Sequence, residues 1–389
     1  MATAQGPFSL YVHIPYCGSK CPYCDFNSHV VPAVPEAAYT DALVGELDAR
    51  AGLEEWRDRA IQTVFFGGGT PSLFRPQSIA RLLERAAARF GFLRDCEITL
   101  EANPGTVDPE KLRGYRNCGI NRISLGAQSF QPRLLRFLGR THTAEETEQA
   151  LAHVERSGFE NFSLDLIYAV PGQTLEELDS DLRVALSFRP PHLSAYNLTI
   201  EEGTPFHREL AAGRLRPLGE EEEIEMADRI EQRLGEAGLL RYEISNYARP
   251  GFESRHNLNY WRGGDYLGLG AGAHSFARDG AHNAGGRRWW NEKSPARYIE
   301  RVAESGFAAA GTEESDPEKA AGEFVLSGLR LSAGISLTAF SARFGKNLLE
   351  LRPEIPDWID AGFMEVEGDR LRLTRRGLMV ANSLFVHFV

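Results

Sequence analysis

The run Tyr11-Val-His-Ile-Pro-Tyr-Cys17-Gly-Ser-Lys-Cys21-Pro-Tyr-Cys24-Asp-Phe26 places three cysteines in a Cys-x3-Cys-x2-Cys spacing after a short apolar segment. An iron–sulfur cube with four irons usually takes four cysteine thiolates, so three thiolates leave one iron open to an exchangeable ligand. In zinc proteins, too, an open position marks a catalytic rather than a structural site. The spacing therefore predicts a [4Fe-4S] cluster held by Cys17, Cys21 and Cys24.

Two other uses of these cysteines compete with this prediction. A disulfide is disfavoured because the three cysteines are clustered and odd in number, and no secretory leader precedes them. Structural zinc is the stronger alternative, since His29 lies five residues past Cys24 and could complete a Cys3His site. Cys96 and Cys118 stand apart from the motif, and we expect them to be ordinary thiols.

The bulk properties indicate a globular protein. The chain has 389 residues, 42% of them hydrophobic, and a net charge of −11, which disfavours non-specific binding to nucleic acid. No apolar run approaches the roughly 18 residues of a membrane span, and residues 1–7 lack the features of a signal peptide. Five cysteines without a leader fit a reducing compartment, so we expect a cytoplasmic protein.

Strand-like and helix-like segments alternate along most of the chain. The expected strands are Phe8–Ile14, Ile61–Phe66, Glu97–Ala102, Arg122–Gly126, Asn161–Ile167 and His192–Leu198. Their apolar composition favours strands covered on both faces. The expected helices between them include Glu36–Ala51, Pro76–Phe90, Thr143–Ser157 and Thr174–Ser187. Such alternation predicts parallel strands with right-handed crossovers, and six units fit a partial (β/α)6 barrel of TIM type, an α/β fold.

The C-terminal part of the chain has a different pattern. The expected helices are Glu318–Leu331, Leu337–Phe344 and Ile355–Ala361, and the expected hairpin strands are Phe363–Glu367 and Arg370–Leu373. We therefore predict a barrel domain with its extension over residues 1–290 and a small winged-helix-like α+β domain over residues 291–389. The glycine- and arginine-rich stretch Gly280–Arg288 is expected to be a loop.

Polar and glycine residues gather where the predicted strands end. Gly67-Gly-Gly-Thr-Pro71 follows the second strand, Glu101 ends the third, Gln128 follows the fourth, and Asp165 lies late in the fifth. In barrels of parallel strands the functional residues lie at the C-terminal ends of the strands. Buried carboxylates without partners are costly, which favours a ligand-binding role for Glu101 and Asp165.

These motifs together resemble the radical S-adenosylmethionine (radical SAM) superfamily, in which the amino and carboxylate groups of SAM chelate the open iron. The runs Ser9–Pro15, Gly67–Pro71, Arg122–Phe130 and Asp165–Tyr168 resemble more specifically the oxygen-independent coproporphyrinogen III oxidase family. That resemblance implies SAM contacts at the matching positions, which are Tyr11, Tyr23, Gly68, Gly69, Thr70, Glu101, Gln128, Arg140 and Asp165, and more loosely Thr199 and His274. Arg140 can grip a carboxylate through two parallel hydrogen bonds.

Two features depart from the oxidase. Phe26 stands where the oxidase has a further cysteine, and only sixteen residues precede Cys17, so we expect the N-terminal substrate cover of the oxidase to be absent. The run His256-Asn-Leu-Asn-Tyr-Trp261 is similar to the distinguishing motif of a sister branch, the heme chaperone HemW family. The resemblance makes His256 a candidate axial ligand of heme iron, with flat contact from Tyr260 and Trp261. The alternative is a histidine hydrogen-bonded beside two core aromatics.

The resulting hypothesis is a heme chaperone that binds a [4Fe-4S] cluster, SAM and heme and passes heme to acceptor proteins, with peripheral contact to membrane hemoproteins. One rival is an oxygen-independent coproporphyrinogen III oxidase-like enzyme of porphyrin biosynthesis. Others are a radical SAM enzyme acting on a different small molecule, and a zinc-stabilised binding protein. Phe26 argues against the oxidase, so whether the protein is an enzyme stays open at this point.

Overall fold

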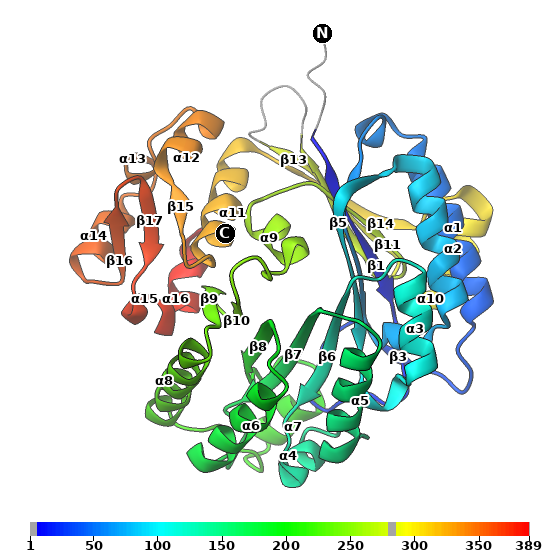
Figure 1. Cartoon of the computed structure of the whole chain (residues 1–389). Helices are drawn as coiled ribbons and strands as arrows, with labels where there is room; N and C mark the ends of the chain where they lie inside the picture. Colours follow the sequence, from blue (N-terminus) through cyan, green and yellow to red (C-terminus); the bar gives the residue numbers. More distant parts are fainter. Residues whose placement is uncertain (1–5, 279–284, 389) are drawn as a thin grey trace.

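Six parallel strands form the centre of the molecule. The computed structural model describes residues 6–278 and 285–388 (Figure 1). Its central strands, in spatial order, are β1 (Phe8–Ile14), β4 (Ile61–Gly68), β5 (Phe92–Ala102), β6 (Arg122–Gln128), β7 (Asn161–Tyr168) and β8 (His192–Asn197). All neighbouring pairs among them are parallel. The six predicted strands are therefore confirmed, and each overlaps its expected range.

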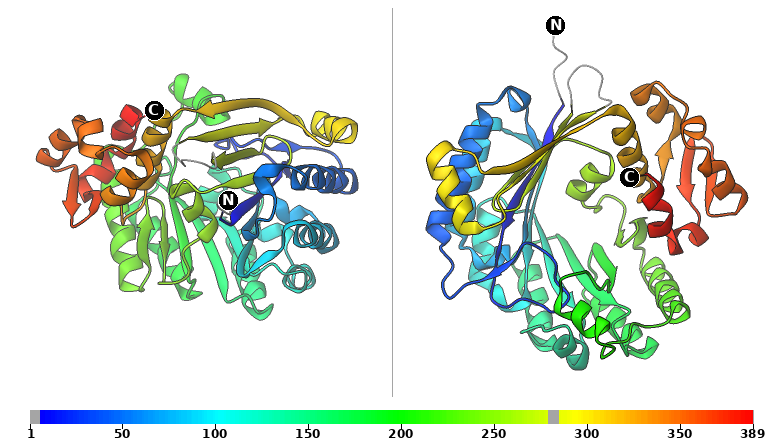
Figure 2. Two further views of the ribbon diagram at one scale, coloured as in Figure 1. Left: turned by 90° about the horizontal axis from the view of Figure 1, so that it is seen from above. Right: turned by 180° about the vertical axis from the view of Figure 1, so that it is seen from behind.

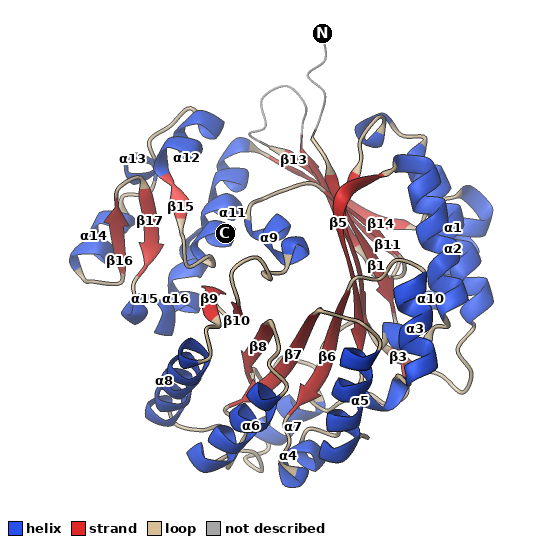
Figure 3. Cartoon of the chain, in the orientation of Figure 1, coloured by secondary structure: helices blue, strands red, loops and turns tan. Residues whose placement is uncertain are grey.

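Helices cover the outer side of these strands, as Figure 3 shows. They are α1 (Glu36–Ala51), α2 (Pro76–Phe90), α3 (Pro109–Asn117), α4 (Pro132–Phe137), α5 (Ala144–Arg156) and α6 (Leu175–Ser187). Helices α5 and α6 both begin with a capping box, in which Thr143 pairs with Glu146 and Thr174 with Glu177. Each box satisfies two backbone donors that the first turn leaves without partners, which explains why these two helix starts were predictable.

The sheet extends at both ends beyond the six strands. Strand β11 (Tyr266–Leu269) pairs with β1, and β12 (His274–Arg278), β13 (Gly286–Asn291) and β14 (Ala309–Ser315) follow it in antiparallel order. At the other end, β10 (Asn246–Ala248) and β9 (Leu240–Glu243) continue from β8. The twelve described strands are ordered from β14 to β9 without closing, so the barrel is partial.

One expected loop is partly a strand. Of the stretch Gly280–Arg288, residues 280–284 lie outside the described residues, whereas Gly286–Arg288 belongs to β13 and pairs with β12. Four of the six added strands have only three to five residues, as in the run Tyr266-Leu-Gly-Leu269. They were missed because so short a segment carries little alternation for a sequence pattern to reveal.

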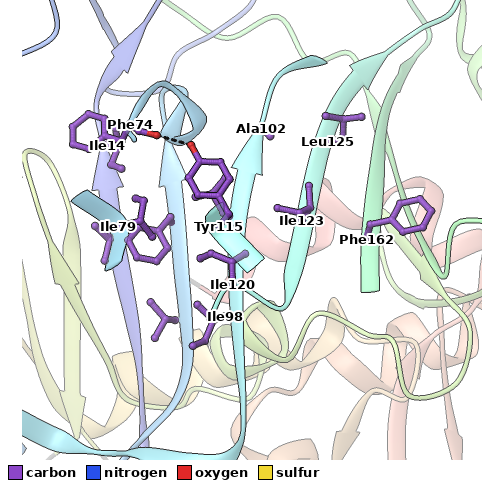
Figure 4. Packing of buried hydrophobic residues seen from close by; sticks show 14 of the residues in the cluster. Ile14, Phe74, Ile79, Ile98, Ala102, Tyr115, Ile120, Ile123, Leu125 and Phe162 are labelled. Atoms are coloured by element: carbon purple, nitrogen blue, oxygen red, sulfur yellow. Dashed lines mark hydrogen bonds between the residues drawn. The ribbon is translucent and has the colours of Figure 1, made fainter. Parts of the chain in front are cut away.

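The two faces of the parallel strands differ in polarity. Residues such as Val64, Leu100 and Ile123 pack under the helices in the main hydrophobic core, part of which is drawn in Figure 4. Residues on the opposite face include many polar side chains, and Ser9, Thr63, Thr99, Ser163 and His192 among them are buried. Successive residues of a strand point to opposite faces, so the inner face of this partial barrel is a polar surface, whereas the face under the helices is apolar.

The C-terminal part forms a unit with its own core. It contains α11 (Pro317–Leu329), α12 (Leu337–Phe344), α13 (Leu348–Leu351) and α14 (Glu354–Asp360), and a three-stranded sheet of β15 (Ile335–Ser336), β17 (Arg370–Leu373) and β16 (Met364–Glu367). A separate hydrophobic cluster holds these elements together. Helices followed by a hairpin match the winged-helix-like prediction, and Figure 2 shows the unit beside the barrel.

The chain division predicted at residue 290 falls inside β13. That strand pairs along its length with β14, so the larger sheet continues to Ser315. We therefore propose that the division lies at about residue 316, where α11 and the second core begin. Among the described residues, no helix is both long and apolar enough to cross a membrane.

Candidate functional site

The three cysteines of the motif lie on a loop after β1 and line one cavity. The loop leaves through β2 (Tyr16–Cys17) and returns through β3 (His29–Val30), which pairs with β2. The cavity has a volume of about 570 Å³ and is bordered by Cys17, Cys21 and Cys24. The Cys17 sulfur accepts a hydrogen bond from Thr70 Oγ1 at 3.5 Å, and the Cys21 sulfur accepts one from Arg140 Nη1 at 3.5 Å.

His29 does not join the cysteines. Its Nε2 is 3.1 Å from Asn27 Oδ1, and His29 is not among the residues that line the cavity. Moreover, no three His, Cys, Asp or Glu side chains of the described residues are arranged around a single metal position. Tetrahedral zinc would require four donors within about 2–2.3 Å of one point, so the arrangement gives no support to the Cys3His alternative.

The glycine triplet allows the backbone at the end of β4 to pack closely against the start of the cysteine loop. Gly68 has a φ of +111°, and a Cβ on it would lie 2.4 Å from the His13 ring. A Cβ on Gly69 would lie 2.7 Å from the carbonyl oxygen of Tyr16. Only glycine tolerates such contacts. The backbone nitrogens of Gly69 and Thr70 donate to Ile14 O and Tyr16 O, both at 2.8 Å, which fixes the loop that carries Cys17.

Two carboxyl groups on the inner face of the strands also border this cavity. The carboxylate of Glu101, on β5, accepts from the backbone nitrogen of Gly68 at 3.2 Å. Asp165, on β7, accepts from Ser124 Oγ at 3.0 Å and from Ser163 Oγ at 3.3 Å. Burial and the nearby Asp165 raise the pKa of Glu101 to about 8, and burial raises the pKa of Asp165. Neither carboxyl forms an ion pair with any described residue.

Gln128 and Arg140 occupy the same cavity on the side of β6. Gln128 has a φ of +66°, a left-handed conformation that is uncommon for residues other than glycine and that often accompanies function. Arg140 Nη2 donates to Asn103 Oδ1 at 2.5 Å and to Gly126 O at 3.1 Å. Arg140 Nε is buried and has no hydrogen-bond partner among the described residues, so this N–H group could donate to a bound ligand.

Asn103 and Ser124 are among the residues of this cavity that the sequence did not indicate. Asn103 bonds both Arg140 and Thr70 Oγ1, the latter at 3.1 Å, and so connects the strand ends. Ser124 holds Asp165. Asn103 lies two residues after Glu101, and Ser124 lies two before Gly126 on the same strand face. The period of two along each strand could therefore have indicated both.

The remaining predicted contacts divide between two cavities. Tyr23 and the exposed Thr199 line the cysteine cavity. Tyr11 and His274 instead line a second, adjoining cavity, and Gly68 and Glu101 border both. Tyr11 therefore faces away from the thiols, with its hydroxyl 2.9 Å from His13 Nδ1.

The structure argues against His256 as a heme ligand. It lies on α9 (Arg255–Trp261) and is buried, and its Nδ1 is 2.8 Å from Thr63 Oγ1 and its Nε2 is 2.9 Å from the Tyr260 hydroxyl. Because Thr63 donates its proton to Ser9, His256 Nδ1 donates to Thr63 and Nε2 accepts from Tyr260. Burial lowers the pKa of His256 to about 3. Both ring nitrogens are occupied, so the hydrogen-bonded alternative is favoured.

The whole His256–Trp261 run connects the barrel to the C-terminal unit. Asn259 accepts from Gln62 Nε2 at 2.9 Å and donates to Asp265 O at 3.1 Å. The guanidinium of Arg330, which follows α11, lies 4.4 Å from the centre of the Trp261 ring, a cation–π contact. The run therefore lies between the two units and contacts both of them.

Comparison with known proteins places this arrangement in a family. Residues 11–185 match a model of the Radical SAM superfamily, and residues 316–380 match one of the HemN C-terminal domain. The heme chaperone HemW of Escherichia coli is 38% identical over 98% of both chains, and that of Bacillus subtilis is 35% identical over 98% of this chain and 99% of its own. The chain belongs to the HemW family.

Structural comparison agrees on the fold. The HemN coproporphyrinogen III oxidase of Escherichia coli, described as a radical SAM enzyme, superposes with a TM-score of 0.81 and 24% identity, covering 98% of this chain and 90% of its own. This likeness confirms the partial barrel with a C-terminal domain. The second family match begins at residue 316, one residue before α11, whose Ala321, Val325 and Leu329 belong to the second hydrophobic core.

Proposed function

We propose that this member of the HemW family holds a [4Fe-4S] cluster and SAM in the cysteine cavity and carries heme to acceptor proteins in the cytoplasm. The observation that carries the proposal is the gathering of three thiols, two half-buried carboxyls, Gln128 and Arg140 around one cavity of about 570 Å³. The curated relatives, at 33–38% identity, bear the name heme chaperone, which supports the heme-carrying part.

The residues of the cavity suit SAM. Three thiolates leave one iron of a bound cluster without a protein ligand, and that iron can take the amino and carboxylate groups of SAM. Glu101 and Asp165 have oxygens for hydroxyl or ammonium donors, and a cationic ligand would favour their ionised forms, which burial disfavours. Arg140 donates a hydrogen bond to the Cys21 sulfur, and Gln128 offers both a donor and an acceptor.

Phe26 bears on the rival oxidase function. Its side chain is 64% exposed and lines both cavities. A phenyl ring at this place supplies no further thiol or proton donor, but it offers a flat apolar surface. Reactions through radical intermediates need a site that excludes water and positions the reactants. Because the Phe26 ring is exposed where it borders the two cavities, the site is more open than such reactions need. This openness favours a carrier over an oxidase.

The first experiment tests the cluster. Protein reconstituted anaerobically should contain about four irons and four sulfides per chain, and Cys17→Ala, Cys21→Ala and Cys24→Ala should each lose them. Cys96→Ala and Cys118→Ala are matched controls, because neither residue lines the cavity. One zinc per chain and no sulfide would overturn the proposal.

The second experiment tests the carrier function. Protein loaded with heme should transfer it to an apo-hemoprotein, membrane hemoproteins included, as followed by the absorption of the acceptor. The same protein, reduced and given SAM and coproporphyrinogen III, should form no decarboxylated product. Repeated turnover of that substrate would instead establish the oxidase function.

A further inference from the structure

A second cavity lies between the barrel and the C-terminal unit. Its volume is about 650 Å³. One wall comes from β1, the Tyr260–Gly264 segment and strands β11 to β13, and the other from α11 and α12, which contribute Ala320, Glu323, Phe324, Ser327 and Arg343. It shares Phe26, Gly68 and Glu101 with the cysteine cavity, so a ligand here would lie next to that site.

The walls of this second cavity are rich in aromatic rings. Tyr260 and Tyr266 meet edge to face with their ring centres 4.7 Å apart, and Phe276, Phe324, Trp261 and the exposed Phe26 also border the space. Flat apolar side chains around a cavity of this size suit a large planar aromatic ligand.

The cations of the cavity outnumber its effective anions. Arg288, Lys293 and Arg343 line it, opposite the carboxyls of Glu101 and Glu323. Glu323 and Arg288 neutralise each other through hydrogen bonds of 3.0 and 3.1 Å, so the net charge of the cavity depends on Lys293, Arg343 and Glu101. When no cationic ligand lies beside it, Glu101, whose pKa is raised to about 8, is largely protonated near neutral pH. Although the whole chain carries a charge of −11, this space therefore attracts a ligand with carboxylates.

His274 is the histidine of this cavity that is free to bind a metal. The other lining histidine, His13, has Nδ1 2.9 Å from the Tyr11 hydroxyl and Nε2 2.8 Å from Asn27 O. His274, on β12, is exposed, lies over the Trp290 ring with centres 5.9 Å apart, and makes no side-chain hydrogen bond to the described residues. Burial raises the pKa values of Tyr11 and Tyr260, so neither phenol is suited to bind as phenolate.

We propose, on the basis of the proposed heme-carrying function, that this second cavity is the heme site and that His274 supplies the axial nitrogen. The aromatic walls contact the macrocycle, and the cations face its two propionates. The position beside the cysteine cavity would allow SAM and the cluster to influence heme loading or release, and the exposed Phe26 and His274 leave an exit toward an acceptor.

The test titrates ferric heme into full-length, cluster-loaded protein and records heme absorption and EPR spectra. His274→Ala should lose the wild-type bands and bind heme more weakly, while SAM affinity and iron content stay unchanged. Added imidazole should restore the bands in that variant by occupying the vacated position. Ser327→Trp, which fills the cavity from α11, should lower heme binding by an independent route. His153→Ala is the matched control, since His153 lies on α5 and lines neither cavity.

The outcomes separate this inference from the proposed function. If the wild type binds no heme at all, the heme-carrying function itself fails. If the wild type binds heme but His274→Ala and Ser327→Trp behave like it, the site is elsewhere and the inference is overturned. A change of the bands in His256→Ala, with His274→Ala unaffected, would assign the axial position to α9 instead.

Discussion

Glu101 is a residue that we expect to lower the stability of the folded protein while it contributes to SAM binding. Its half-buried carboxyl lies at the end of β5, near Asp165, and accepts one backbone hydrogen bond from Gly68. Its pKa is about 8 in the folded chain and near 4.3 in an unfolded one. Between these values the folded state holds a proton that the unfolded state has lost, so stability falls as pH rises from about 4 to 8.

Glu101→Gln should therefore stabilise the protein without ligand. The neutral amide keeps an acceptor for Gly68 and cannot ionise, so the melting temperature should rise relative to wild type, and more at pH 8 than at pH 5. Each unit of pKa shift corresponds to about 1.4 kcal/mol. SAM affinity should fall at the same time, by roughly ten- to a hundredfold, since a hydrogen bond to a charged group contributes about 1.5–3 kcal/mol.

The control for this substitution is Glu110→Gln, on the exposed surface of α3. It should change neither the pH dependence of the melting temperature nor SAM affinity. A Glu101→Gln variant whose melting temperature followed that of wild type at both pH values would show that Glu101 titrates normally in the folded chain.

At the scale of elements, helix α6 positions the loop that follows Gln128. Asp181 lies on the buried side of α6 and accepts from Ser129 Oγ at 2.6 Å and from the backbone nitrogen of Phe130 at 2.9 Å. It also accepts from Gln131 Nε2 at 2.9 Å. These bonds hold the chain directly after the left-handed Gln128, although Asp181 does not line the cavity. Asp181 is therefore a positioning residue.

Asp181→Ala should weaken both the fold and the cysteine cavity. Removing the carboxylate leaves the Phe130 nitrogen without a partner, and we expect a loss of about 2–4 kcal/mol in the free energy of unfolding. SAM affinity should fall while iron content is kept, measured by calorimetry on reconstituted protein.

Asp179→Ala is the matched control on the same helix. Asp179 pairs with Arg229 at the surface, and such an exposed pair contributes about 0–1 kcal/mol. Equal losses of SAM affinity in the two variants would mean that the effect arises from α6 as a whole, which would contradict the positioning role of Asp181.

At the scale of the whole molecule, two cavities meet where the barrel and the C-terminal unit face each other. The first is built from the barrel and the cysteine loop, whereas the second needs α11 and α12 as its far wall. Asn27 connects them, because it follows Phe26 on the cysteine loop and donates to Ala271 O at 2.9 Å and to Lys293 O at 3.0 Å beside the second cavity.

Each ligand should therefore protect different parts of the chain from hydrogen exchange. Heme should slow exchange in α9, α11 and β12, since a ligand that binds only the folded form stabilises the elements it contacts. SAM should slow exchange at the ends of β4, β5 and β6 instead. Mass spectrometry of peptides from cluster-loaded protein can measure both. Protection by heme confined to the cysteine loop would contradict the assignment of heme to the second cavity.

Local signals in the sequence determined the six parallel strands, the main helices between them and one candidate site. The Cys17–Cys24 spacing, the capping boxes of α5 and α6, and the apolar strands depend on residues close together in the chain, so they could be recognised without the fold. Placing polar residues at strand ends also anticipated that Glu101, Gln128 and Asp165 would meet, because parallel strands end at one edge.

Only the tertiary structure decided which side chains already have hydrogen-bond partners within the protein and which cavity each of them faces. It enclosed His256 between Thr63 and Tyr260, turned Tyr11 away from the thiols, and left the His274 ring facing a cavity completed by residues about fifty positions later. These outcomes depend on which strand face is inward and on how the two hydrophobic cores pack against each other. Such long-range contacts leave no period or spacing in the sequence, so they could not have been predicted from it.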